Sequence, residues 1–173
     1  MNIVSEILCA LWFILPAYAA NAFPPLMKGK IPIDRGKKLG KYRILGDGKT
    51  VEGTLGGIAF GIFIGLTQIF FQSKIPRSMG LVEMTLPLIL ALSIGALTGD
   101  IIGSFIKRRL GIERGRPAPL LDQLDFLALA ILFSSLLTRI KILHIFLLII
   151  LTPIIHYSAN ILGYLLRIKR VPY

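Results

Sequence analysis

Long apolar runs alternate along the chain with short segments rich in lysine and arginine. No Asp, Glu, Lys or Arg occurs from Ile7 through Met27, and a run of that length is enough for a helix that crosses a bilayer. Four further apolar runs follow. The pattern predicts an all-α integral membrane protein with five transmembrane helices in a single domain, 1–173. Their predicted bounds are about 5–25, 54–72, 82–106, 120–138 and 142–166.

Composition supports a membrane protein. The chain is 54% hydrophobic and 17% charged, whereas a soluble domain of this length needs a far more polar surface. The single cysteine, Cys9, excludes a disulfide framework and a cysteine-ligated zinc site. Ala17-Tyr18-Ala19 mimics a signal-peptidase site, but the preceding residues carry Glu6 and no Lys or Arg. We therefore expect the first apolar run to be a retained helix.

The distribution of basic residues predicts the orientation in the membrane. Residues 28–50 hold eight Lys and Arg, residues 107–119 hold five and the segment after residue 166 holds three, whereas the two other connections hold two each. Short loops rich in Lys and Arg stay in the cytoplasm. We therefore expect a multi-pass protein of the cell membrane with its N-terminus outside and its C-terminus in the cytoplasm. Membrane-flanking charge without interleaved aromatic residues also argues against nucleic-acid binding.

Three aspartates near the predicted cytoplasmic ends of helices are candidates for a site. Asp100 lies within the third predicted span, where an ionisable side chain is costly unless it faces a partner or a wet cavity. A structural pair with a buried Arg or Lys is the alternative. Asp122 and Asp125 open the fourth span at i, i+3 and therefore share one helix face, although helix capping also favours Asp there.

The other acidic residues and the histidines are expected to be less informative. Glu6 and Glu83 fall near outer span ends, where a solvated or interfacial position is the default. Asp34 lies among basic loop residues and is expected to be a solvated partner. His144 falls near the outer face with no evident role, and His156 lies inside the fifth span, where it can hydrogen-bond between helices.

A glycine-rich segment before the second span offers groups that bind phosphate. It reads Gly46-Asp47-Gly48-Lys49-Thr50 and provides backbone N–H groups, a hydroxyl and an ammonium group at a helix start. It is not a P-loop, because Arg43 stands where that motif needs glycine and no strand precedes it. An ordinary interfacial turn remains the alternative. The basic stretch after Asp100 either binds phosphate as well or only orients the helix.

Three segments, in order, resemble motifs of the phosphatidate cytidylyltransferases (CDP-diacylglycerol synthases). Residues 49–57 read Lys-Thr-Val-Glu-Gly-Thr-Leu-Gly-Gly, residues 99–108 read Gly-Asp-Ile-Ile-Gly-Ser-Phe-Ile-Lys-Arg, and residues 121–125 read Leu-Asp-Gln-Leu-Asp. The chain departs from the family at Val51, where Trp is usual, and at Gln123, where Arg is usual. Its compact layout and its Asn21-x-x-Pro24 are similar to the archaeal branch of the family, the CDP-archaeol synthases.

The resemblance implies a membrane cytidylyltransferase. Its substrates would be CTP and an isoprenoid glycerol ether lipid phosphate, drawn from among the membrane lipids, and its products would be unsaturated CDP-archaeol and pyrophosphate. Mg²⁺ would be the cofactor, because hard oxygen ligands beside phosphate-binding cations suit it. The residues implied at the site are Asp100, Asp122 and Asp125 for the metal, Lys107 for catalysis, and Gly46, Asp47, Gly48, Lys49, Thr50, Glu52, Ser104 and Arg108 for the nucleotide.

Two other functions are alternatives for the same residues. A membrane transporter of an anionic solute also uses intramembrane carboxylates, but the acidic residues here gather at one predicted face. A CDP-alcohol phosphotransferase would need Ala-Arg soon after Asp47-Gly48 and a wider spacing of the later aspartates, and the chain has neither.

Overall fold

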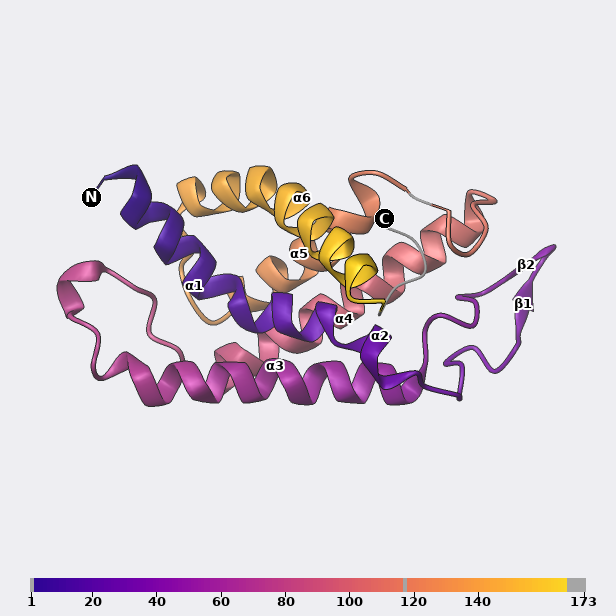
Figure 1. Cartoon of the computed structure of the whole chain (residues 1–173), viewed down its shortest axis with the longest axis horizontal. Coiled ribbons are helices and arrows are strands. Elements are labelled where there is room, and N and C mark those ends of the chain that lie inside the picture. The colour runs from indigo at the N-terminus through magenta and orange to yellow at the C-terminus, as the bar shows by residue number, and fades with distance from the viewer. Residues whose placement is uncertain (1, 117, 168–173) are drawn as a thin grey trace.

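The protein is an elongated bundle of helices from which a small β-hairpin projects (Figure 1). The structure, a computed structural model, describes residues 2–116 and 118–167. In chain order its elements are α1 (Ile3–Ala22), α2 (Pro24–Met27), β1 (Lys38–Leu39), β2 (Tyr42–Arg43), α3 (Val51–Gln72), the 3₁₀ helix η1 (Arg77–Met79), α4 (Leu86–Arg109), α5 (Leu121–Ser135) and α6 (Ile142–Leu165).

Four helical segments of the described chain are long and apolar enough to cross a membrane. They are Ile3–Met27, which joins α1 and α2, and the helices α3, α4 and α6. The remaining helix, α5, has 15 residues and a length of about 22 Å, less than the roughly 30 Å of a hydrocarbon core. The sequence predicts a helix over 120–138, but the regular helix ends at Ser135 and continues as turns. The protein is therefore a multi-pass helical membrane protein with one shorter helix among longer ones.

The two-stranded hairpin departs from the predicted all-α fold. Strand β1 pairs antiparallel with β2, with Lys38 opposite Arg43 and Leu39 opposite Tyr42. Gly40 between the strands has a φ of +65°, a conformation that glycine adopts without steric cost. Such a short hairpin has no periodic apolar signal, so the hydrophobic pattern could not reveal it.

Local sequence explains where the helices begin and where α1 ends. The Asn2 side chain accepts a hydrogen bond from the Ser5 N–H at 2.9 Å, and Thr50 accepts one from Gly53 N–H at 3.1 Å. Both satisfy a backbone donor that the first helical turn leaves free. Helix α1 ends at Ala22, just before Pro24 and Pro25, which have no backbone N–H to continue its hydrogen bonds.

Glycines let α3 lie close to α1 and α4. A Cβ added at Gly57 would lie 2.6 Å from the Ala20 carbonyl oxygen, and one at Gly61 would lie 2.8 Å from the Pro16 carbonyl oxygen. The core lies among α1, α4, α5 and α6. Its largest fully buried apolar side chains include Phe13, Ile14, Met84, Ile89, Leu92, Leu127 and Leu148.

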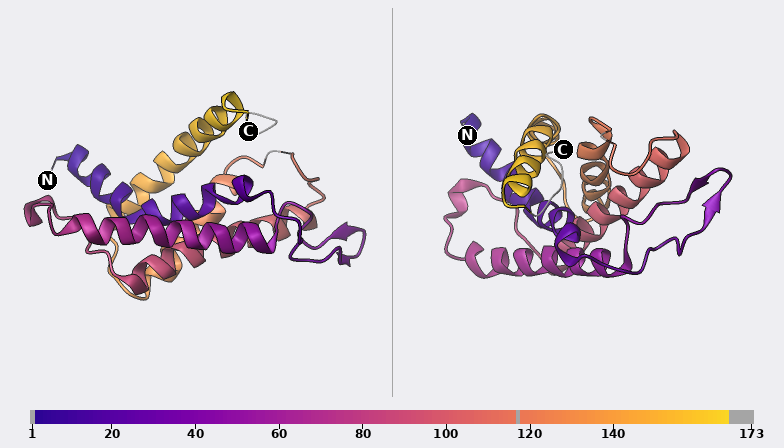
Figure 2. Two further views of the ribbon diagram at one scale, coloured as in Figure 1. Left: turned by 60° about the horizontal axis from the view of Figure 1, so that its bottom comes forward. Right: turned by 45° about the vertical axis from the view of Figure 1, so that its right-hand side comes forward.

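The bundle has two distinct ends. The hairpin end holds β1–β2, the C-terminal ends of α1 and α4, and the start of α3 (Figure 1). The N-terminal end holds the first turn of α1, η1 and the start of α6, as the contacts of Cys9 with Met79 and of Glu6 with Lys141 show. In the left-hand view of Figure 2, α6 leads away from α1 and α3 toward its C-terminus.

Candidate functional site

The predicted site residues lie at the hairpin end, where α4 and α5 are in direct backbone contact. Gly95, Gly99 and Gly103 form a stripe on α4 that faces α5. A Cβ added at Gly99 would lie 2.8 Å from both the Asp125 carbonyl carbon and the Phe126 Cα, and one at Gly103 would meet the Asp125 carboxylate. Small residues four apart permit such close packing in membranes. This stripe was not predicted, although its spacing is visible in the chain.

Asp100, inside α4, is paired with a lysine from another element. Its Oδ2 lies 2.5 Å from the Nζ of Lys49, which stands just before α3. The two side chains are 24% and 22% exposed, so each is partly withdrawn from solvent. A structural ion pair was the alternative considered for Asp100, and Lys49 is the partner. The same contact brings the glycine-rich segment against α4.

Asp122 and Lys107 form a second ion pair across the start of α5. The other carboxylate oxygen of Asp122 accepts a hydrogen bond from the Ala118 N–H at 2.8 Å. Asp122 thus both shapes the chain entering α5 and neutralises a lysine in the last turn of α4. Asp122 does not cap α5, because Ala118, whose N–H it accepts, precedes the helix.

Asp125 lies between these pairs without joining either. Its carboxylate packs on Gly103 and is within electrostatic range of Asp100, Lys49 and Lys107. In residues 2–116 and 118–167, no three Asp, Glu, His or Cys side chains come close enough to hold one metal ion. The three predicted aspartates share one region of the α4–α5 pair, but two of them are directed toward lysines rather than toward one common point.

The glycine-rich segment is held by its own neighbours. Gly46 N–H donates to Asp34 at 2.9 Å, and Asp47 forms an ion pair with Arg43 at 2.7 Å. Gly48 lies beside Arg114, whose Nε would be 3.4 Å from an added Cβ. The segment is therefore a turn that is held by a hydrogen bond and an ion pair, and it directs Lys49 toward α4.

Thr50 and Glu52 fix the start of α3. Thr50 is the N-cap residue and is only 9% exposed. Both carboxylate oxygens of Glu52 accept hydrogen bonds from the backbone, from Lys30 N–H at 3.1 Å and from Ile31 N–H at 3.1 and 3.2 Å. Glu52 thus ties the chain after α2 to α3, a role that the sequence analysis did not foresee.

The expectation that Asp34 is solvated is wrong. Asp34 is 6% exposed and accepts hydrogen bonds from the backbone N–H groups of Gly36, Leu45 and Gly46 and from Arg43. The Arg43 guanidinium and these N–H groups hold the pKa of the Asp34 carboxyl well below its usual range, and Asp34 in turn raises the pKa of Arg43. A buried carboxylate needs such partners, so Asp34 organises the loop that leads to Lys49.

The last turns of α4 carry a buried serine and two arginines. Ser104 is 4% exposed. Arg109 donates to the backbone carbonyls of Leu39 at 2.8 Å and Arg43 at 2.7 Å, which fastens the hairpin to α4. The Nε atoms of Arg108 and Arg109 are buried and have no hydrogen-bond partner within the described part of the chain. Sequence analysis gave Arg109 no individual role, because its partners are backbone atoms.

A cavity of about 300 Å³ opens between α1, α5 and α6. It is lined mainly by apolar side chains, with Phe126 next in sequence to Asp125. Tyr18 and Thr152 in its wall share a hydrogen bond of 2.7 Å between their hydroxyl groups. His156 in this wall lies 3.4 Å from the side chain of Asn160 in the same helix, and its ring lies beside that of Phe126 in α5. Its predicted hydrogen bond between helices stays a prediction.

Two residues at the N-terminal end also differ from expectation. Glu6 was expected to be solvated or interfacial but is 9% exposed, and His144, expected to have no role, is 2% exposed. The Glu6 carboxylate lies 2.7 Å from His144 Nε2. Burial of an ionisable group is tolerated here because partners surround it.

Comparisons with known proteins agree on one family. The family model described as CarS-like, CDP-archaeol synthase, matches residues 3–173. A CDP-archaeol synthase of Pyrococcus horikoshii is 45% identical over 98% of this chain and 99% of its own, and one of Thermococcus gammatolerans is 45% identical over the whole of both. A solved structure, described as an intramembrane enzyme for archaeal membrane lipids biosynthesis, is 41% identical and covers 90% of this chain and 94% of its own, with a TM-score of 0.79.

Proposed function

The chain belongs to the CDP-archaeol synthase family, and from that premise we propose how its residues carry out the reaction. It is a membrane cytidylyltransferase of archaeal lipid biosynthesis. Its proposed substrates are CTP and an isoprenoid glycerol ether lipid phosphate, and its products are unsaturated CDP-archaeol and pyrophosphate. The comparisons do not support the alternative function, transport of an anionic solute.

The proposal for the site rests on the arrangement of charges at the hairpin end. Asp100 and Asp122 are paired with Lys49 and Lys107, and Asp125 lies within electrostatic range of both lysines. Three carboxylates against two ammonium groups leave one formal negative charge. Such a site offers oxygen ligands to a cation and, on flexible lysine side chains, two positive charges to phosphate.

The donor chemistry of the three aspartates fits Mg²⁺. This ion takes oxygen ligands and is usually bound by one or two carboxylates together with substrate phosphates, so three protein ligands at one point are not required. Asp100, Asp122 and Asp125 would hold it. When bound, it neutralises phosphate charge and stabilises the leaving pyrophosphate.

The reaction needs little acid–base catalysis by the protein. The nucleophile is an oxygen of the lipid phosphate, which is already ionised near neutral pH. Its bond to the α-phosphorus of CTP forms while the bond from that phosphorus to the pyrophosphate oxygen breaks, and pyrophosphate leaves. Two polyanions must be positioned and their charge screened, and this is the task we assign to Lys49, Lys107 and the neighbouring arginines.

We propose that the CTP phosphates lie between the glycine-rich segment and the last turns of α4. Lys49 and the N-terminus of α3 approach from one side, where backbone N–H groups favour an anion. Ser104 and Arg108, one helical turn apart on α4, approach from the other. The buried, unpartnered Nε of Arg108 supports this placement. Thr50 and Glu52 contribute by fixing the start of α3 rather than by direct contact.

The isoprenoid chains of the lipid are proposed to enter the cavity between α1, α5 and α6. Its lining is mainly apolar, and Phe126 in its wall follows Asp125 in α5. A lipid held there would have its tails among apolar side chains and its phosphate near the aspartates.

We further propose that the hairpin end faces the cytoplasm, that the N-terminus is outside and that α5 completes a five-span topology. The basic segments 28–50 and 107–119 both lie at the hairpin end, which supports this orientation. Lys169 and Arg170, two of the three basic residues after residue 166, lie outside the described residues, as does Pro117 in the connection before α5.

The test is CDP-lipid formation by purified protein in nanodiscs, supplied with labelled CTP, Mg²⁺ and one lipid phosphate at a time. We expect product with the isoprenoid ether lipid phosphate. Asp122→Asn and Asp125→Asn should each lower the rate by roughly 100-fold or more, as loss of a charge-stabilising group does. Glu113→Gln, an acidic residue of the α4–α5 connection whose side chain is 73% exposed, is the matched control and should leave the rate unchanged.

Two outcomes would overturn parts of this proposal. If no lipid phosphate yields a CDP-lipid, the enzymatic function is wrong. If either aspartate variant keeps full activity, that residue does not belong to the site.

A further inference from the structure

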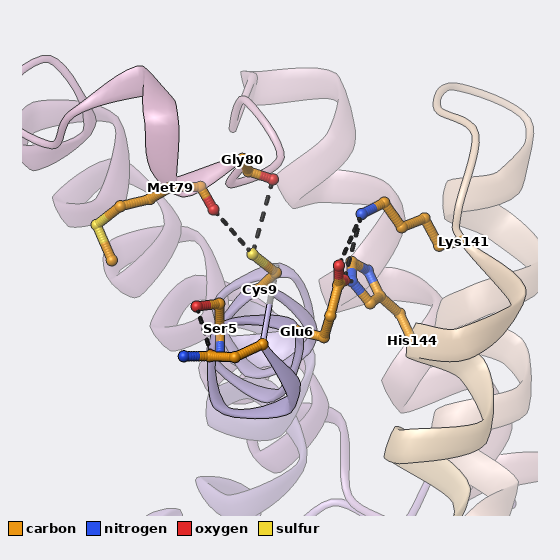
Figure 3. A network of polar contacts seen from close by, with 8 residues as sticks. Ser5, Glu6, Cys9, Met79, Gly80, Lys141 and His144 are labelled. Carbon is orange, nitrogen blue, oxygen red and sulfur yellow. Dashed lines mark hydrogen bonds and ion pairs between the residues drawn. The ribbon is translucent and has the colours of Figure 1, made fainter.

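A polar cluster joins α1 to α6 at the N-terminal end (Figure 3). The aspartates of the candidate site lie at the opposite, hairpin end. The Glu6 carboxylate in the first turn of α1 accepts hydrogen bonds from Lys141 Nζ at 3.2 Å to each oxygen, and it contacts His144 Nε2 at 2.7 Å. The side chains of Glu6 and His144 are 12% and 3% exposed. Burying charge in a membrane protein is costly, and the mechanism proposed above makes no use of this cluster.

A second polar contact joins the same two helices, near the C-terminal end of α1 and the middle of α6. The Tyr18 and Thr152 hydroxyl groups are 2.7 Å apart. Between His144 and Thr152 the helix rises about 12 Å, so the first part of α6 is fastened to α1 at two separated points. Together with Leu148, which is fully buried between them, these contacts set the direction of the helix axis, and loss of the one nearest the helix start loosens that direction.

Beyond Thr152, α6 forms a wall of the cavity. The helix continues through Pro153 to Leu165, and its residues from Thr152 to Leu166 face the cavity across from Tyr18, Asn21 and Leu26. From Thr152 to Leu162 the helix rises about 15 Å. If the contact at His144 is lost, pivoting about Thr152 moves the far wall of the cavity by about as much as it moves the start of α6.

We propose that Glu6 is a positioning residue for lipid binding, which acts through Lys141 and His144 to fix the direction of α6 and thereby the width of the cavity. This inference rests on the proposed function in one respect, that the cavity receives the lipid phosphate. Glu6 touches neither substrate. Its loss therefore changes the binding of the lipid and leaves the binding of CTP at the far end of α4 unaltered.

The kinetic test compares variants of this cluster with a matched control. Glu6→Gln removes the charge, and Lys141→Met breaks only the ion pair at a side chain that is 55% exposed, so the second variant should fold even if the first does not. We expect KM for the lipid phosphate to rise about tenfold in both, since small displacements in a binding site have effects of that order. KM for CTP and kcat should stay within about twofold. Glu83→Gln, an exposed acidic residue at the same end, should change none of the three.

A structural readout separates this inference from the proposed function. In a Cys9→Ala background, spin labels on Leu55 at the start of α3 and Leu165 at the end of α6, both exposed, report how α6 is directed. The distance distribution should shift or broaden in Glu6→Gln and Lys141→Met and stay as it is in Glu83→Gln. This measurement does not depend on enzyme activity. It therefore tests whether Glu6 fixes the direction of α6 even if the lipid phosphate is not the substrate.

The inference is overturned if the distance distribution is unchanged in both cluster variants. It is equally overturned if KM for CTP rises together with KM for the lipid, because such a change indicates general loosening of the fold rather than positioning of α6.

Discussion

Replacing Gly99 with alanine tests whether the close approach of α4 and α5 sets the geometry of the site. An alanine Cβ would lie 2.8 Å from the Asp125 carbonyl carbon and from Phe126 Cα, whereas ordinary contact begins at 3.4 Å. The Asp125 carbonyl oxygen would be closer still. Because these are backbone atoms in a packed interior, α5 must move away by more than about 0.6 Å. The movement displaces Asp125 relative to Asp100.

The magnitudes separate an effect on activity from an effect on stability. Alanine is favoured over glycine in a helix by about 1 kcal/mol, and overpacking costs about 1–3 kcal/mol. The net loss in folding free energy is then at most about 2 kcal/mol, and the protein should stay folded. A misplacement of about 1 Å in a catalytic site costs roughly 100-fold, so a shift of this size should lower kcat/KM by at least about tenfold.

The assay is the rate of CDP-lipid formation from labelled CTP, read beside the thermal melting temperature of each variant. Gly56→Ala is the control, because its new Cβ would meet the flexible Met27 side chain at 2.8 Å, away from α5. It should keep near wild-type activity. If folded Gly99→Ala protein keeps more than half of the wild-type kcat/KM, the idea that this glycine sets the site geometry is refuted.

Three more predictions follow from the same contacts. Lys49→Met should raise KM for CTP about tenfold, as loss of a charged phosphate contact does, and an unchanged KM would place the phosphates elsewhere. Asp34→Asn should speed amide hydrogen exchange at Gly46 roughly tenfold, since it weakens a charge-assisted hydrogen bond. In the wild type, Arg43 keeps the pKa of Asp34 low. The Gly46 amide should therefore stay protected from hydrogen exchange below the ordinary carboxyl pKa of about 4, and lose this protection only as the pH falls through the lowered pKa. Loss of protection already at about pH 5 would contradict this. Chelation of divalent cations should abolish CDP-lipid formation and added Mg²⁺ should restore it, whereas activity that survives chelation would exclude a metal-dependent site.

Much of the helical layout follows from sequence, because exposure to lipid is a local property of a segment. The apolar runs predict α3, α4 and α6 to within a few residues. Helices α1 and α3 begin at Ile3 and Val51, slightly before the predicted bounds, because Asn2 and Thr50 cap them. The shorter α5 was less well predicted, since the apolar run continues past Ser135 while the backbone turns away from the helix.

The motifs of the candidate site were also visible in the sequence, but not how its residues pair. The three aspartates and the glycine-rich segment meet at one end of the bundle, as their positions in the predicted spans imply. That Asp100 pairs with Lys49 depends on how α3 lies against α4. The role of Asp34 could not be foreseen either, because its main partners are backbone N–H groups of a loop without periodicity.

The chain by itself determined that this is a helical membrane protein, which segments enter the membrane, and which residue types are available for phosphate chemistry. Only the tertiary structure decided which charges neutralise one another, across 51 residues for Lys49 and Asp100 and across 138 for Glu6 and His144. The reason is physical. Hydrophobicity acts on each segment separately, whereas the partner of a buried charge depends on which helices approach, and that depends on contacts such as the one Gly99 permits.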